Sequence, residues 1–133
     1  MNHARLGAGI LLLVCCACSD KPSFELPDRT ASVRAEESRV ASLLAASPGH
    51  GLLDTTTDAR CRVRLLRKVL ATDYVWADCT ARGEGVSVPV RVDNVRITVA
   101  ADGADRGALN ALERIFPTDM ARAIRADESR YKP

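Results

Sequence analysis

The chain has 133 residues and a formal net charge of only +2, from 19 Lys and Arg against 17 Asp and Glu. This balance gives no general attraction to nucleic acid or to anionic lipid, so we expect neither nucleic acid nor a charged lipid surface as a general partner. The length suits one small domain with one core, and because aromatic residues make up only 4% of the sequence, that core must be mostly Val, Leu, Ile and Ala.

The first 17 residues have the layout of an export signal. A short opening that contains Arg5 precedes residues 6–14, which are only Leu, Gly, Ala, Ile and Val. Counted through Ala17, this apolar run of about 12 residues is shorter than the roughly 20 that a membrane-spanning helix needs, and the charged residues Asp20 and Lys21 soon follow it. We therefore predict that residues 1–17 are a removable signal peptide.

The segment Leu-Leu-Val-Cys-Cys-Ala-Cys at positions 12–18 resembles the lipobox of bacterial lipoproteins. In that family a signal peptidase cuts before a cysteine that carries diacylglycerol and then an amide-linked acyl chain such as palmitate. Ala17 matches the small residue before the cut, whereas Cys15 stands where leucine is commonest. The resemblance implies lipid on Cys18, which would hold the protein on a membrane of the cell envelope with its domain outside the cytoplasm. An ordinary cut after Ala17 is the alternative, and it would leave a freely diffusing protein.

Residues 18–30 form the predicted link between lipid and domain. Two prolines and the lack of a periodic pattern indicate an extended tether after Cys18. Ser19 and then Asp20 follow the cysteine. Because the best-known inner-membrane retention signal of the family has Asp directly after the cysteine, the resemblance favours the outer membrane, with the domain facing the periplasm.

A helix is expected next, at the start of a single domain that spans residues 31–130. Thr30 or Ser32 can cap its beginning, and Val33, Val40 and Leu44 follow helical spacing. Pro48 and the glycine after it end the pattern.

Two cysteines remain once the signal is removed and Cys18 is acylated. In an oxidising compartment Cys61 and Cys79 predict a disulfide, and the alternative is two buried thiols. An antiparallel hairpin in which the two cysteines face each other also places Arg62 opposite Asp78 and gathers the apolar residues on one face. This agreement supports the disulfide independently of the cysteine count.

A second hairpin is predicted after residue 85, where valines alternate with other residues in a half-buried strand. Asp93 and Asn94 would make its two-residue turn, since both residue types tolerate positive φ. That register places Val92 opposite Val95 and Arg91 opposite Arg96.

Helical spacing returns after residue 105 and is interrupted at Pro117, which indicates two short helices or one kinked helix. The order of helix, four antiparallel strands and broken helix predicts an α+β domain in which the sheet curls over the first helix. This order is similar to that of cystatin-like domains of two layers. The similarity concerns topology alone and implies no activity.

No catalytic constellation is visible in the mature sequence. His50 is its one histidine, and there is no nucleophile elbow, no phosphate-binding glycine loop and no pair of histidines at metal-ligand spacing. We predict no enzyme activity, no cofactor and no metal site.

One face of the predicted sheet collects the residue types that are enriched at interface centres. As a candidate binding face we select Arg62, Arg64, Tyr74, Trp76, Arg91 and Arg96. The alternatives are a solvated face, or one covered by the C-terminal helix.

The predicted function is that of a non-enzymatic, envelope-anchored lipoprotein that binds another envelope protein, as an accessory, inhibitor or immunity protein. A small-ligand or cell-wall-binding module is the alternative, and it would need a cavity inside the curled sheet.

Overall fold

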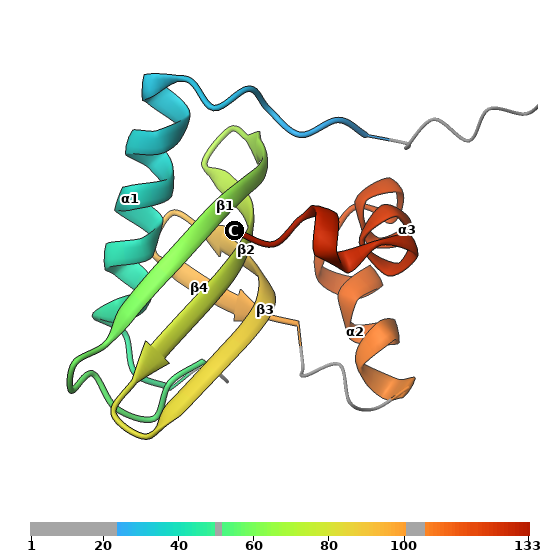
Figure 1. The fold of residues 1–133 in the computed structure, drawn as a ribbon. Helices are drawn as coiled ribbons and strands as arrows, with labels where there is room; N and C mark the ends of the chain where they lie inside the picture. The colour runs from blue at the N-terminus through green and yellow to red at the C-terminus, as the bar shows by residue number, and fades with distance from the viewer. Residues whose placement is uncertain (1–23, 50–51, 101–105) are drawn as a thin grey trace, which may run out of the picture.

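The computed structural model describes residues 24–49, 52–100 and 106–133, so the export signal, Cys18 and His50 lie outside the described residues. Its elements are α1 (Ala31–Ala45), β1 (Arg60–Val69), β2 (Thr72–Ala81), β3 (Glu84–Asp93), β4 (Arg96–Val99), α2 (Arg106–Ile115), α3 (Thr118–Ala126) and the short 3-10 helix η1 (Glu128–Arg130). The four strands form one antiparallel sheet in the order β1-β2-β3-β4. The predicted α+β class and the strand meander are confirmed (Figure 1).

Helix α1 begins and ends as the sequence indicates. The Thr30 hydroxyl accepts a hydrogen bond from the Val33 N–H at 3.3 Å, which satisfies one of the exposed donors of the first turn. Val40 and Leu44 are fully buried, because this side of the helix packs on the valine-rich face of the sheet. None of the helices in the described part of the chain is long and apolar enough to cross a bilayer.

The β1–β2 hairpin has the predicted register. Cys61 lies opposite Cys79 and Arg62 opposite Asp78, and the two cysteines form a disulfide. The pairing shifts at Leu66, which is an extra residue in β1 and therefore a β-bulge. Leu66 is buried in a second core, on the side of the sheet away from α1.

The predicted register of the β3–β4 hairpin is wrong. Its two-residue turn is Asn94 and Val95, so Asp93 pairs with Arg96 and Val92 pairs with Ile97. Asn94 takes the positive φ of 57°. Asp93 stays in the strand because its carboxylate accepts hydrogen bonds from the Thr72 hydroxyl at 2.6 Å and from Arg91.

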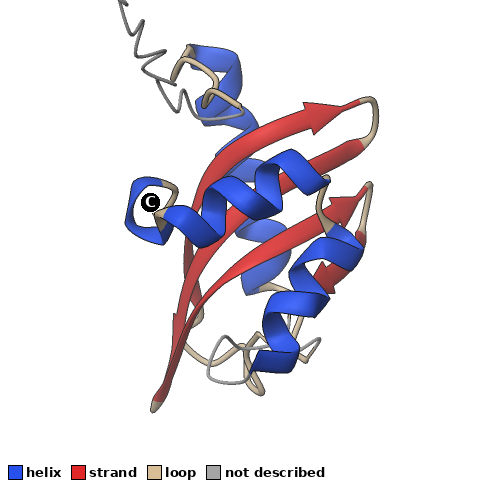
Figure 2. Cartoon of the chain, turned by 90° about the vertical axis from the view of Figure 1, so that its right-hand side faces the viewer, coloured by secondary structure: helices blue, strands red, loops and turns tan. Residues whose placement is uncertain are grey.

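Helices cover both faces of the sheet, so the fold has a third layer beyond the two of the cystatin-like comparison. Helix α1 packs on one face, and α2 and α3 pack on the other (Figures 1 and 2). The second core contains Leu66 and Trp76 from the sheet and Phe116, Met120 and Ile124 from the helical segment. Pro117 separates α2 from α3, which confirms the predicted break.

The segment before α1 packs on the body of the domain. Phe24 is buried and its ring stacks on Tyr131 with 5.2 Å between the ring centroids. The Arg67 guanidinium also lies over the Phe24 ring, 5.4 Å from its centroid. Arg29, further along the segment, forms an ion pair with Glu37 at 2.7 Å. Phe24 and Tyr131 therefore both contribute to the packed body of the domain.

Candidate functional site

The aromatic centre of the predicted binding face is covered by the C-terminal segment. Trp76 is only 2% exposed, and its indole N–H donates to the Ser87 hydroxyl at 2.8 Å. Tyr74 packs edge to face on Phe116, with 5.2 Å between centroids, and Lys132 lies 5.2 Å from the Trp76 ring. These two aromatic side chains are packing residues of the second core, which corresponds to the alternative of a face covered by the C-terminal segment.

The two arginines of the second hairpin do not face each other. Arg91 lies opposite Thr98, and its guanidinium pairs with Asp93 at 2.9 Å. This hydrogen bond raises the pKa of Arg91. Arg96 is exposed beside the β3–β4 turn, so the like-charge pair expected from the sequence does not form.

Arg62 and Arg64 lie on β1, which is an edge strand of the sheet. The N–H of Leu65 points away from β2, because it donates to the buried Glu37 carboxylate at 3.0 Å. In an antiparallel ladder every second residue has the same direction, so the N–H groups of Val63 and Cys61 also point outward. Glu37 therefore closes the edge at Leu65, and the stretch before it borders a groove.

This groove lies between α1 and β1 and has a volume of about 350 Å³. The small side chains Ser38 and Ala41 on α1 leave the space open. It is lined by Arg29, Arg34, Glu37, Ser38, Ala41, Cys61, Arg62, Val63 and Pro133.

Arg34 on α1 and Arg62 on β1 line this groove, and Arg60 and Arg64 flank Arg62 at two-residue spacing on the same face of β1. We call Arg34, Arg60, Arg62 and Arg64 the edge arginines. Within the described ranges no carboxylate lies within 4.0 Å of Arg34, Arg60 or Arg64. Arg62 has only a long contact of 3.4 Å with Asp78, and its side chain is 77% exposed. Such an exposed pair contributes little, so the charge is available to a partner.

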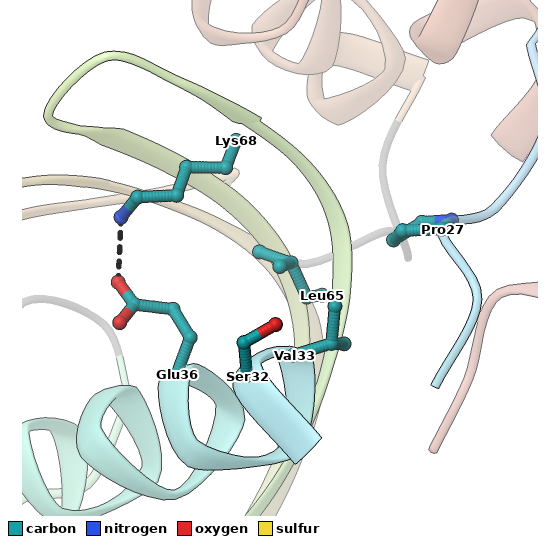
Figure 3. A pocket seen from close by; sticks show the side chains of 6 residues that line it. All are labelled: Pro27, Ser32, Val33, Glu36, Leu65 and Lys68. Atoms are coloured by element: carbon teal, nitrogen blue, oxygen red, sulfur yellow. Dashed lines mark hydrogen bonds and ion pairs between the residues drawn. The ribbon is translucent and has the colours of Figure 1, made fainter. Parts of the chain in front are cut away.

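A second hollow, of about 430 Å³, lies between the start of α1 and β1 (Figure 3). Its charged groups are already paired: Glu36 contacts Lys68 at 2.7 Å and Arg39 at 2.8 Å. The buried Asp73 contacts the same two cations. Hydrogen bonds from Arg39 and Lys68 lower the pKa of Glu36 to about 2, whereas burial raises the pKa of Asp73. This network joins α1 to the β1–β2 hairpin.

The edge site was only partly visible in the sequence. The sequence analysis includes Arg62 and Arg64 because they are predicted to lie beside Trp76, and it does not include Arg34 and Arg60. Their common position depends on β1 being an edge strand, and no local pattern reports strand order. Over the residues that are described, no three His, Cys, Asp or Glu side chains gather as a metal site.

Fold and site together define a three-layer α+β domain with an arginine-lined groove at an open sheet edge. Comparison with protein-family models, with curated proteins and with solved structures found no match for this chain.

Proposed function

We propose that this chain is a non-enzymatic lipoprotein of the cell envelope, anchored through lipid on Cys18, whose β1 edge binds an acidic, extended segment of another envelope protein. The role would be that of an accessory, inhibitor or immunity protein. The observation that carries the proposal is the set of edge arginines on both sides of outward-facing backbone groups.

Strand addition explains why both features occur together. A segment that pairs with β1 at Cys61 and Val63 would gain backbone hydrogen bonds from the edge. Its side chains would alternate between the α1 side, where Arg34 lies, and the opposite side, where Arg62 and Arg64 lie. Acidic side chains would then meet a cation on either face, so charge would select the partner.

The filled interior of the sheet favours a protein partner over a small ligand. Val75, Val90 and Val92 are fully buried beneath α1, and Trp76 fills the opposite face together with Met120. A ligand module would need a cavity at one of these places.

The partner site is tested by photo-crosslinking in the cells that export the protein, with a photoreactive residue at position 62 and, as control, at the exposed turn residue Arg82. We expect one acidic envelope protein to be crosslinked from position 62 and not from position 82. Equal crosslinking from the two positions would contradict the edge site.

Charge reversal then measures the contribution of the cluster. Arg62→Glu with Arg64→Glu should weaken binding of the crosslinked partner at least about tenfold, and more strongly at low salt. The matched control is Arg82→Glu with Arg122→Glu, which makes the same change in net charge at two exposed positions away from the groove. Equal losses in the two double variants would mean that only net charge matters.

The anchor is tested by the intact mass of the membrane-extracted protein. A mass that begins at Cys18 and carries lipid supports the proposal, whereas an unmodified chain that begins at Cys18 overturns the anchored state.

A further inference from the structure

Exposed apolar side chains gather at one end of the sheet. In the described part of the chain the large exposed hydrophobic residues are Val69, Leu70 and Val95, with exposed fractions of 49%, 92% and 68%. The first two lie at the β1–β2 turn and the third at the β3–β4 turn. The Asn94 N–H donates to the Ala71 carbonyl at 3.0 Å, which joins the two turns. We call Val69, Leu70 and Val95 the tip patch.

Leu70 occupies a backbone conformation that does not suit it. Its φ is +54°, in the left-handed region that favours Gly and Asn over a residue with a large side chain. Because 92% of the residue is exposed, its side chain makes almost no packing contacts that could stabilise the fold. A leucine that is both strained and exposed indicates a role outside the folded chain.

The anchor keeps this end of the domain close to the bilayer. Five residues separate Cys18 from Phe24, and this length of chain reaches at most about 20 Å. Phe24 is fixed against Arg67, which stands two residues before Val69 in β1. In Figure 1 the segment that enters α1 and the β1–β2 turn both lie towards the top of the molecule, and in Figure 2 they lie on opposite sides of that upper part.

From this geometry we propose that the tip patch inserts into the headgroup and acyl boundary of the membrane that holds the lipid anchor. The inference rests on the lipid anchor of the proposed function. Because a short anchor already holds the domain at the membrane, a weak apolar contact is enough to keep the tip patch inserted. Two valines and a leucine on turns give shallow insertion, and the exposed Arg96 beside Val95 matches lipid phosphates.

The test uses the mature, lipidated protein in vesicles of phosphatidylethanolamine and phosphatidylglycerol that contain a brominated lipid. An environment-sensitive fluorophore is attached through Leu70→Cys or, as control, through Thr56→Cys in the exposed loop before β1. The Cys61–Cys79 disulfide keeps the native cysteines from being labelled. We expect the bromine to quench the probe at position 70, with a blue-shifted emission, and to leave the probe at position 56 unquenched.

A second variant separates membrane contact from folding. Leu70→Asn removes the apolar side chain but suits the positive φ, so the melting temperature should stay the same or rise. In this variant a probe at Val95→Cys should lose about half or more of its quenching. Lipid on Cys18 together with an unquenched probe at position 70 would overturn the tip contact alone, whereas an unlipidated chain would overturn it together with the anchor.

Discussion

Truncation of Trp76 should cost a large share of the stability of this domain. The side chain is 2% exposed and packs among Leu66, Met120 and Tyr131 in the second core. Trp76→Ala would leave a cavity between the sheet and α3 and remove the hydrogen bond to Ser87, so we expect a loss of about 4 kcal/mol in the free energy of unfolding. Trp76→Phe keeps most of the apolar volume and should lose about 1 to 2 kcal/mol.

The assay is equilibrium unfolding in urea followed by far-UV circular dichroism, because Trp76 is the single tryptophan of the chain and its fluorescence is lost in the variants. Arg64→Ala is the matched control, because Arg64 lies directly opposite Trp76 on the neighbouring strand β1. Its side chain is partly exposed and has no acidic partner among the described residues, so its effect should stay within about 0.5 kcal/mol. A loss below about 1 kcal/mol for Trp76→Ala would refute the packed third layer and restore the open aromatic face.

Two further predictions concern the first core and its charged border. Replacement of Cys61 and Cys79 by Ala opens a link between positions 18 residues apart, and should reduce the free energy of unfolding by about 3 kcal/mol in the same urea assay; an unchanged midpoint would contradict the chain-entropy reasoning. The pKa of Glu36 is lowered from 4.5 to about 2 in the folded protein, so its contribution is complete above pH 4.5 and is lost as the pH falls towards 2. Glu36→Gln should therefore flatten the decline of stability over this range. Burial raises the pKa of Asp73 above 3.8, so protonation of Asp73 acts in the opposite direction, and it does so only as the pH falls towards 3.8. Equal acid profiles for the variant and the wild type would show that this network contributes nothing.

The β1–β2 hairpin was predictable because independent chemical requirements agreed on one register. A disulfide needs its two cysteines opposite each other, and the same alignment pairs Arg62 with Asp78. The β3–β4 hairpin had no such constraint. Its turn was placed by the local preference of Asp93, but the structure holds this residue in the strand through Thr72 on a neighbouring strand. A contact between strands therefore outweighed the turn propensity.

The third layer could be suspected from the sequence but not located by it. Leu112, Phe116, Met120 and Ile124 form apolar stripes that must be buried somewhere. Trp76 is equally suited to an interface and to an internal core, and periodicity cannot distinguish the two. No sequence pattern predicts the packing of Phe24 on Tyr131, since a single aromatic residue beside prolines shows no hydrophobic periodicity.

The two proposed contacts divide strand β1 between them. The edge arginines Arg60 to Arg64 lie in its first half, and the tip patch begins at Val69. From Arg62 to Val69 the strand rises about 20 Å at 3.3 Å per residue, because the bulged Leu66 adds no length. Glu37 closes the edge between the two halves through its hydrogen bond to Leu65. A domain whose tip touches the bilayer would therefore hold its open edge well above the headgroups, where a strand of a neighbouring envelope protein could reach it without displacing lipid.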